Sequence, residues 1–87
     1  AYWGPYAVSK FATEGLMQVM ADEYADTTIR VNCINPGATR TSMRARAYPG
    51  EDVNQLKTPA DLMWVYLYLM SDESINTNGQ SIDAQRK

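Results

Sequence analysis

Histidine is absent from this sequence of 87 residues, and cysteine occurs only once, as Cys33. The chain therefore has no imidazole to act as a general base, and it lacks one of the commonest zinc ligands. A single cysteine also excludes an internal disulfide bond, which fits a reducing compartment. We expect no metal site, and any catalysis must use other side chains.

Long apolar runs and clustered positive charges are also scarce. The longest apolar run, Leu62–Met70, has nine residues, whereas a membrane-spanning helix needs about 20. The N-terminus shows neither the basic nor the apolar region of a secretory signal. The net charge is −2, and the basic residues cluster in one loop, as Arg40, Arg44 and Arg46. We predict a cytoplasmic protein that binds neither membranes nor nucleic acid. Arg40 and Arg44 could meet an acidic group of a cofactor or substrate or simply face solvent, and we favour solvent.

The first predicted element is a helix that begins at Gly4-Pro5 and ends near Ala25. Proline suits a first helical turn, where its missing N–H is not needed. Met17 and Tyr24 fall outside the apolar face, either as scattered surface residues or as a subunit contact. We expect the apolar face to cover another part of the protein, and its residues are Val8, Ala12, Gly15, Leu16, Val19 and Met20.

A strand is predicted next, over Ile29–Asn35, where β-branched residues are frequent. Pro36-Gly37 ends it abruptly. Ala38–Lys57 is a long, loop-like segment in which a short helix can form around residues 41–47. Connections of this length are usually functional or mobile.

A strong helix start follows the loop. Thr58 is a candidate N-cap, Pro59 occupies the first helical position, and Asp61 stands where a capping-box acid belongs. The helix runs to about Met70 and is apolar nearly all round, so we expect it to be buried on more than one side.

The chain closes with a predicted turn at Asn78-Gly79 and a short strand over residues 80–83. Strand, helix and strand in this order predict a parallel βαβ unit, so the fold class is α/β. Two strands are too few for a stable sheet on their own.

Tyr6 and Lys10 are the candidate catalytic pair. Residues four apart are neighbours on a helix, and an ammonium beside a phenol favours the phenolate. Such a tyrosine can give or take a proton at a carbonyl or alcohol oxygen. The pair also occurs by chance in many helices, so it is a weak signal alone.

The surrounding sequence resembles the short-chain dehydrogenase/reductase family over almost the whole chain. The helix "YAVSKFATEGLMQVMADEY" is followed by a strand and by the pattern P-G-x-x-x-T-x-M, formed here by Pro36, Gly37, Thr41 and Met43. The closing "LYLMSDESINTNGQSID" resembles the family's last helix, turn and strand. Two departures stand out: Asn78-Gly79 replaces a frequent Thr-Gly, and "IDAQRK" replaces a frequent Asp-Gly-Gly.

The resemblance implies a fold and a set of roles. The fold would be the C-terminal part of a Rossmann-type doubly wound parallel sheet. Tyr6 would be the catalytic acid/base, and Lys10 would favour its phenolate and hydrogen-bond the nicotinamide ribose of NAD or NADP. Pro36 and Gly37 would shape the loop beside the nicotinamide, while the Thr39 backbone and Thr41 hydroxyl would hold the cofactor.

The resemblance also implies an NAD(P)-dependent oxidoreductase that interconverts a small carbonyl compound and an alcohol. Residues 43–57 would form the substrate lid, and the intact protein would be a homodimer or homotetramer. Residues 1–87 would be the C-terminal fragment of one domain whose nucleotide-binding half lies upstream, and the fragment alone would be inactive.

Two alternatives remain open from the residues themselves. A non-catalytic, family-like binding protein would keep Tyr6 and Lys10 as inherited surface. A free-standing interaction module would use its apolar helix, residues 59–70, to bind a partner. Likewise, Pro36-Gly37 could be no more than a turn that ends a strand, and Thr41 could be no more than the N-cap of a short helix.

Overall fold

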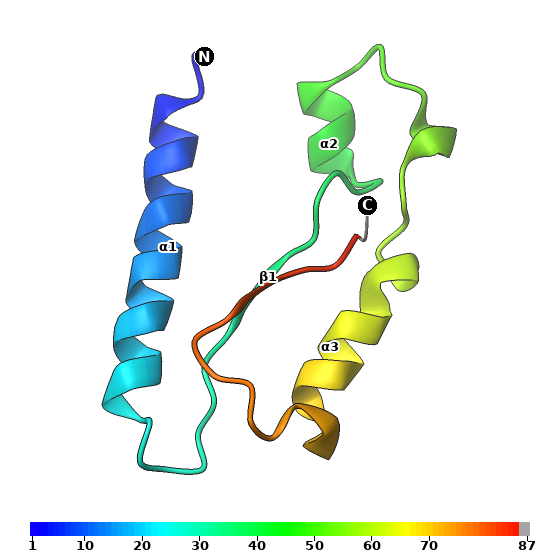
Figure 1. Cartoon of the computed structure of the whole chain (residues 1–87). Helices are drawn as coiled ribbons and strands as arrows, with labels where there is room; N and C mark the ends of the chain where they lie inside the picture. The colour runs from blue at the N-terminus through cyan, green and yellow to red at the C-terminus, as the bar shows by residue number, and fades with distance from the viewer. Residues whose placement is uncertain (86–87) are drawn as a thin grey trace. The chain divides into compact units, whose positions relative to one another are not determined.

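The computed structural model describes residues 1–85 as two compact units. The first unit comprises Ala1–Cys33 and Ile75–Ile82, and the second comprises Ile34–Ser74 and the residues from Asp83 onward. Figure 1 follows the elements along the chain, which are α1 (Gly4–Glu23), β1 (Cys33–Asn35), α2 (Ser42–Ala47), η1 (Val53–Gln55), η2 (Ala60–Leu62), α3 (Met63–Met70), η3 (Asp72–Ser74) and β2 (Ser81–Asp83).

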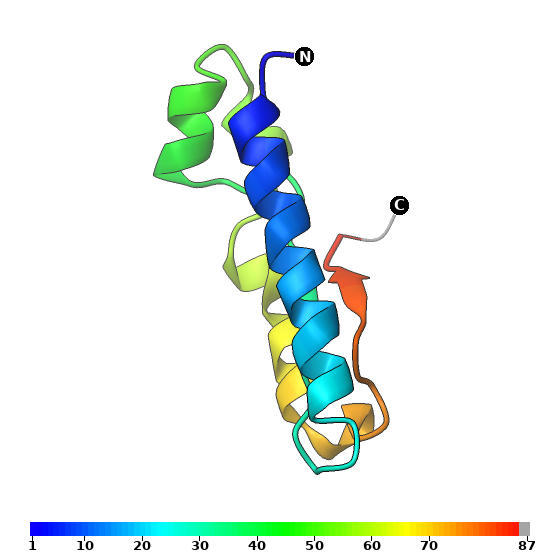
Figure 2. The same ribbon diagram turned by 90° about the vertical axis from the view of Figure 1, so that its left-hand side faces the viewer.

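Helix α1 matches its predicted bounds to within two residues. Its first turn contains Pro5, and it continues without interruption to Glu23 (Figure 2). The helix ends where Thr27 donates from both its backbone N–H and its hydroxyl to the carbonyl of Tyr24, at 3.0 and 2.7 Å. These bonds turn the chain away from the helix axis.

The side of α1 that is buried differs from the prediction. Met17 was expected outside the buried face, yet it and Ala21 are each only 4% exposed. Leu16, on the predicted face, is 60% exposed. The reason is a turn from far along the sequence: Gln18 donates to the carbonyl of Gly79 at 2.8 Å, and Asn78 donates to the carbonyl of Ala21 at 3.0 Å.

Strand β1 is shorter than the predicted span Ile29–Asn35, because side-chain amides replace strand partners before Cys33. The N–H of Val31 donates to Oδ1 of Asn78 at 2.9 Å. The N–H of Gln80 donates to Oδ1 of Asn32 at 3.0 Å. Backbone groups bonded to side chains cannot join the strand ladder, so regular pairing begins only at Cys33.

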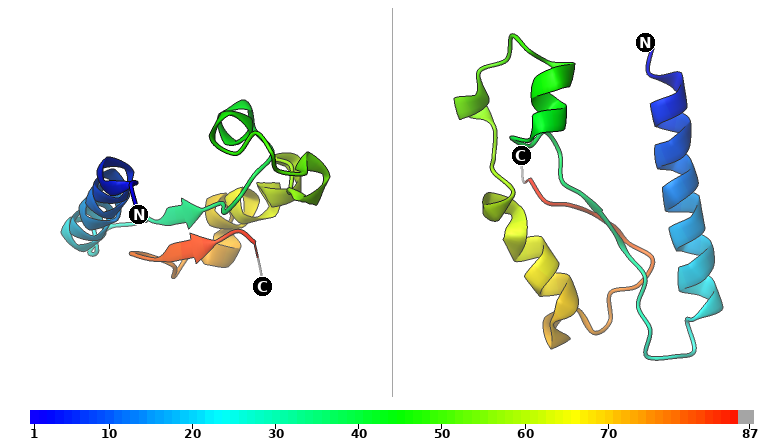
Figure 3. Two further views of the ribbon diagram at one scale, coloured as in Figure 1. Left: turned by 90° about the horizontal axis from the view of Figure 1, so that it is seen from above. Right: turned by 180° about the vertical axis from the view of Figure 1, so that it is seen from behind.

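Strands β1 and β2 are neighbours in a two-stranded sheet. Their arrows point the same way in the left view of Figure 3, so the pairing is parallel. Helix α3 lies between them in sequence. The α/β class and the strand–helix–strand order predicted from the sequence are confirmed.

The start of the last long helix also follows the prediction. The N–H of Thr58 donates to Oδ2 of Asp61 at 2.9 Å, and the N–H of Asp61 donates to Oγ1 of Thr58 at 3.3 Å. This is the reciprocal pattern of a capping box. The first turn is the 3₁₀ segment η2, and α3 continues from it to Met70.

The expected burial of α3 on more than one side is wrong for the part of the chain that the structure describes. Val65 is fully buried and Leu62 is 3% exposed, but Leu67 and Met70 are 65% and 84% exposed. Among the described residues, the side of the helix that carries Leu67 and Met70 is therefore exposed. None of the described helices is both long enough and apolar enough to cross a bilayer.

Candidate active site

Tyr6 and Lys10 lie one turn apart near the start of α1, in the first unit. Nζ of Lys10 is 5.3 Å from the centroid of the Tyr6 ring, within the range of attraction between an ammonium and an aromatic face. The Trp3 ring meets the Tyr6 ring edge to face, with centroids 5.7 Å apart and an interplanar angle of 80°. The predicted pair is therefore brought together.

The environment of Tyr6 allows access to its hydroxyl. The residue is 52% exposed, and a phenol can both donate and accept a hydrogen bond. The nearby hydroxyls of Ser9 and Thr13 donate instead to helix carbonyls, those of Tyr6 and Ser9, at 2.7 and 3.0 Å. Lys10 is thus the charged neighbour of the Tyr6 ring.

The predicted cofactor loop follows β1 in the second unit. Gly37 has φ +75°, a conformation that side-chain-bearing residues rarely adopt. Its N–H reaches Oδ1 of Asn35 at 3.3 Å, and its carbonyl accepts the hydroxyl of Thr39 at 2.9 Å. Pro36, Gly37 and Thr39 therefore form one tight turn after the strand.

Thr41 serves as the N-cap of α2, where its Oγ1 accepts the N–H of Arg44 at 3.1 Å. The structural role considered for this threonine is therefore present. A hydroxyl also carries a hydrogen that it can donate while its oxygen accepts. Capping and cofactor binding by Thr41 are compatible.

The sequence did not predict a second set of hydrogen bonds that holds this loop, made by residues that follow the last strand or lie at its end. Nε2 of Gln85 donates to the carbonyls of Pro36 and Ala38, at 3.0 and 2.6 Å. Nδ2 of Asn35 donates to Oδ1 of Asp83 at 3.0 Å. The only signal available in the sequence was the departure from Asp-Gly-Gly after the last strand.

The segment expected to be a lid has its two ends joined. Thr39 and Lys57 form a parallel bridge, and the N–H of Arg40 donates to the carbonyl of Lys57 at 2.8 Å. The Arg40 guanidinium donates to the carbonyl of Val53 and to Oδ1 of Asn54, at 3.0 and 3.1 Å. Arg40 is exposed, as predicted, but its guanidinium also forms hydrogen bonds within the loop.

Arg44 is likewise engaged. Its guanidinium donates to both carboxylate oxygens of Glu51, at 2.9 and 2.8 Å, and lies 3.8 Å from the centroid of the Tyr48 ring. The hydrogen-bonded guanidinium holds the pKa of Glu51 below its usual value, and Glu51 raises the pKa of Arg44 in return. The backbone of the loop reverses direction between residues 47 and 53, and this brings the partners of Arg40 and Arg44 within reach. Both arginines therefore hold the shape of the loop.

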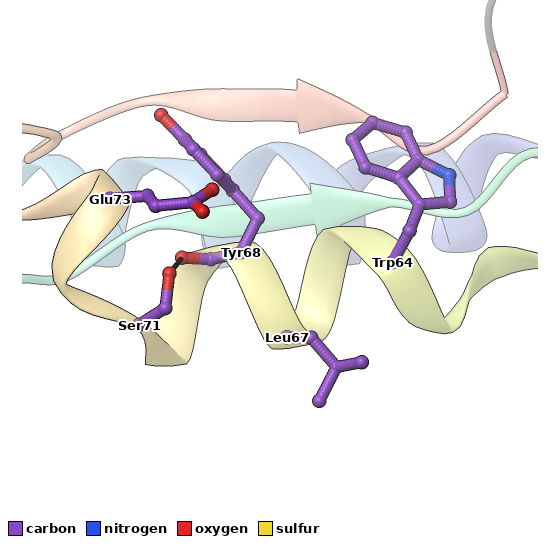
Figure 4. Close-up of a pocket in the computed structure, with 5 residues that line it drawn as sticks. All are labelled: Trp64, Leu67, Tyr68, Ser71 and Glu73. Atoms are coloured by element: carbon purple, nitrogen blue, oxygen red, sulfur yellow. Dashed lines mark hydrogen bonds between the residues drawn. The ribbon is translucent and has the colours of Figure 1, made fainter.

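A shallow hollow lies beside α3 in the second unit (Figure 4). The side chains of Tyr68 and Glu73 extend on the same side of the helix as Trp64, and the hydroxyl of Ser71 donates to the carbonyl of Tyr68 at 2.8 Å. No predicted site residue lines this hollow. Residues 1–85 also contain no cluster of cysteine, aspartate and glutamate that could hold a metal ion.

The predicted site residues thus fall into two groups. Tyr6 and Lys10 belong to the first unit, and Pro36, Gly37, Thr39 and Thr41 belong to the second. Each group is assembled within its own unit, one as an aromatic–ammonium pair and the other as a tight loop.

Known proteins match this arrangement. The family model described as enoyl-(acyl carrier protein) reductase matches residues 1–85. The Escherichia coli (strain K12) protein named uncharacterized oxidoreductase YciK is 64% identical over 85 residues, which cover 98% of this chain and 33% of that protein.

Solved structures agree in both sequence and geometry. A short chain dehydrogenase from Salmonella enterica serovar Typhi is 64% identical with a TM-score of 0.95, over 99% of this chain and 35% of the other. A short chain dehydrogenase from Escherichia coli CFT073, complexed with NADPH, is 63% identical with a TM-score of 0.94, over 99% and 35% of the two chains. The chain therefore spans about a third of the length of these relatives. With a family model that matches all but its last two residues, this chain belongs to the short-chain dehydrogenase/reductase family and has a part of its Rossmann-type α/β fold.

Proposed function

We propose that residues 1–87 are the C-terminal portion of a single NAD(P)-binding Rossmann domain in a longer oxidoreductase. Family membership supports this, as does the length of the relatives, which is about three times the matched part. The upstream portion would supply the nucleotide-binding half, so these residues alone would be inactive. The NADPH complex of the similar Escherichia coli structure supports NAD or NADP as the cofactor.

The proposed reaction interconverts a small carbonyl compound and an alcohol. A nicotinamide cofactor supplies or accepts the hydride at the carbonyl carbon. In reduction, the Tyr6 hydroxyl gives its proton to the substrate oxygen, and in oxidation the phenolate takes it back. The observation that carries this proposal is the pairing of a half-exposed Tyr6 with the Lys10 ammonium, which lies 5.3 Å from the centroid of the Tyr6 ring.

The residues of the loop fit the cofactor roles. Gly37 lets the backbone approach a ligand closely, and its φ of +75° already places it in a turn. Pro36 and Gly37 would lie beside the nicotinamide, with the Thr39 backbone at the carboxamide. Thr41 would donate its hydroxyl hydrogen, and Lys10 would bind the ribose as well as act on Tyr6.

Substitution of Tyr6 tests the mechanism in the full-length protein. Tyr6→Phe removes only the hydroxyl, so kcat is expected to fall at least about 100-fold while cofactor affinity is kept. Lys10→Ala is expected to harm both. Tyr24→Phe, at the C-cap of α1 and 40% exposed, removes a hydroxyl elsewhere and serves as the matched control.

Activity, cofactor binding and folding measurements together separate the alternatives. Wild-type activity in Tyr6→Phe would refute the proposed chemistry. A wild-type protein that binds the cofactor but turns over neither ketones nor secondary alcohols would favour a non-catalytic binding protein. A cooperatively folded, monomeric 87-residue chain would favour an interaction module. Sedimentation of the full-length protein tests the proposed homodimer or homotetramer.

A further inference from the structure

The end of the last strand holds the loop after β1 at several points. The N–H of Ala84 donates to the carbonyl of Asn35 at 2.9 Å, and the Asp83 carboxylate accepts the Asn35 amide at 3.0 Å. Gln85 then reaches past the strand pair to the carbonyls of Pro36 and Ala38. All these residues belong to the second unit.

The Gln85 amide straddles Gly37. One nitrogen, Nε2, serves the carbonyl before Gly37 and the carbonyl after it, which uses both of its hydrogens. A Cβ added at Gly37 would lie 3.1 Å from that nitrogen. The positive φ favours glycine at this position, and a side chain there would also force the Gln85 amide to shift.

Anchoring two carbonyls also orients the N–H groups of the loop. A trans peptide is planar, so the carbonyl of one residue and the N–H of the next point in opposite directions. Because the Ala38 carbonyl points at Gln85, the N–H of Thr39 points away from it. Gln85 therefore helps to set which way the Thr39 N–H faces, together with the bridge between Thr39 and Lys57, without occupying that side of the loop.

We propose that Gln85 is a positioning residue for the nicotinamide end of the cofactor, acting through the backbone of residues 36–39. This inference rests on the proposed function, in which the Thr39 backbone meets the carboxamide. Ala84 and Gln85 follow Asp83 where the family often has two glycines, which have no side chain to reach the loop. The amide anchor is therefore a property of this chain rather than of the whole family.

The experiment uses the full-length protein and three variants. Gln85→Met keeps the length of the side chain but removes its donors, and Gln85→Glu replaces them with a charge that repels the two carbonyls. Gln80→Met makes the same change at an exposed glutamine of the first unit, whose amide donates a long hydrogen bond of 3.5 Å to the carbonyl of Asn78. Wild type is titrated with NADPH and NADH, and the preferred one is used throughout.

Two ligands separate positioning from general damage. The whole dinucleotide contacts the loop through its nicotinamide, whereas its adenine half alone, such as adenosine 2′,5′-bisphosphate for NADPH, does not. Gln85→Met is expected to weaken dinucleotide binding about tenfold, the worth of one to two hydrogen bonds. Binding of the adenine half should stay unchanged, Gln85→Glu should be weaker still, and Gln80→Met should match wild type.

Amide hydrogen exchange of residues 37–41 in the cofactor-free protein provides the second measurement. Faster exchange is expected in Gln85→Met and Gln85→Glu, and not in Gln80→Met. Equal weakening of both ligands would make Gln85 merely structural, and unchanged dinucleotide binding would show that it positions nothing; either result overturns the inference. If wild type binds no dinucleotide at all, both the proposed function and this inference are refuted, even if the exchange data show that Gln85 holds the loop.

Discussion

Asn78 is expected to be among the most sensitive positions outside the proposed site. Its Oδ1 accepts the N–H of Val31 at 2.9 Å, and its Nδ2 donates to the carbonyl of Ala21 at 3.0 Å. One partly buried side chain thus joins the end of α1 to the segment that leads into β1. Asn78→Ala removes both hydrogen bonds and leaves two backbone groups to find new partners.

The cost follows from these two bonds. A hydrogen bond of this kind contributes about 1 kcal/mol net, so Asn78→Ala should lower the free energy of unfolding by about 2 kcal/mol. In a domain of about 250 residues this corresponds to a fall in Tm of roughly 4–8 °C. Asn78→Asp keeps the acceptor for Val31 but turns a carboxylate oxygen toward the Ala21 carbonyl. Mild acid should restore part of that loss, because a protonated carboxyl can donate there.

Urea and thermal denaturation of the full-length protein, followed by circular dichroism, measure these changes. Asn54→Ala is the control, since it removes one exposed hydrogen bond, from Arg40 at 3.1 Å, and should cost less than about 0.5 kcal/mol. Equal losses in Asn78→Ala and Asn54→Ala would refute the reasoning. So would an Asn78→Asp protein whose stability relative to wild type does not depend on pH.

Two further predictions concern the second unit. The lowered pKa of Glu51 means that its pairing with Arg44 stabilises the fold above the ordinary carboxyl pKa, about 4.3, and that this contribution is lost as pH falls through the lower folded value. The stability difference between wild type and Arg44→Met, measured by urea denaturation, should therefore be constant above about pH 5 and shrink in stronger acid, leaving the part due to the contact of Arg44 with the Tyr48 ring; a difference that does not change with pH would contradict the pairing. Thr58→Ala removes the hydroxyl that accepts the N–H of Asp61 and should lower the free energy of unfolding by about 1 kcal/mol in the same assay. An unchanged midpoint would show that the cap does not contribute.

Features that depend on neighbours in sequence were predictable. The capping box of Thr58 and Asp61 involves residues three apart, and Tyr6 and Lys10 meet because they are one helical turn apart. The family pattern around Pro36 and Gly37 located the loop as well. In each case the local backbone conformation alone brings the groups together.

Features that depend on residues far apart in the sequence could not be predicted. Met17 is buried because a turn some sixty residues later packs on that side of α1, and no pattern within the helix reveals it. Gln85 reaches carbonyls 47 and 49 residues earlier. Arg44 and Glu51 pair only because the chain reverses between them. The opposite error, over α3, arose because an apolar pattern states what a helix would bury and not which residues are present to bury it.

The joined ends of the segment between Thr39 and Lys57 have an evolutionary consequence. A loop whose ends already meet can change in sequence or length at little cost to the rest of the fold, because loop-closure entropy grows only slowly with length. Its shape is held mainly by its own contacts, those of Arg40 with Val53 and of Arg44 with Glu51. Such a segment can diverge as a separate module, so that related enzymes could acquire new substrate preferences while the strand ends beneath it stay the same.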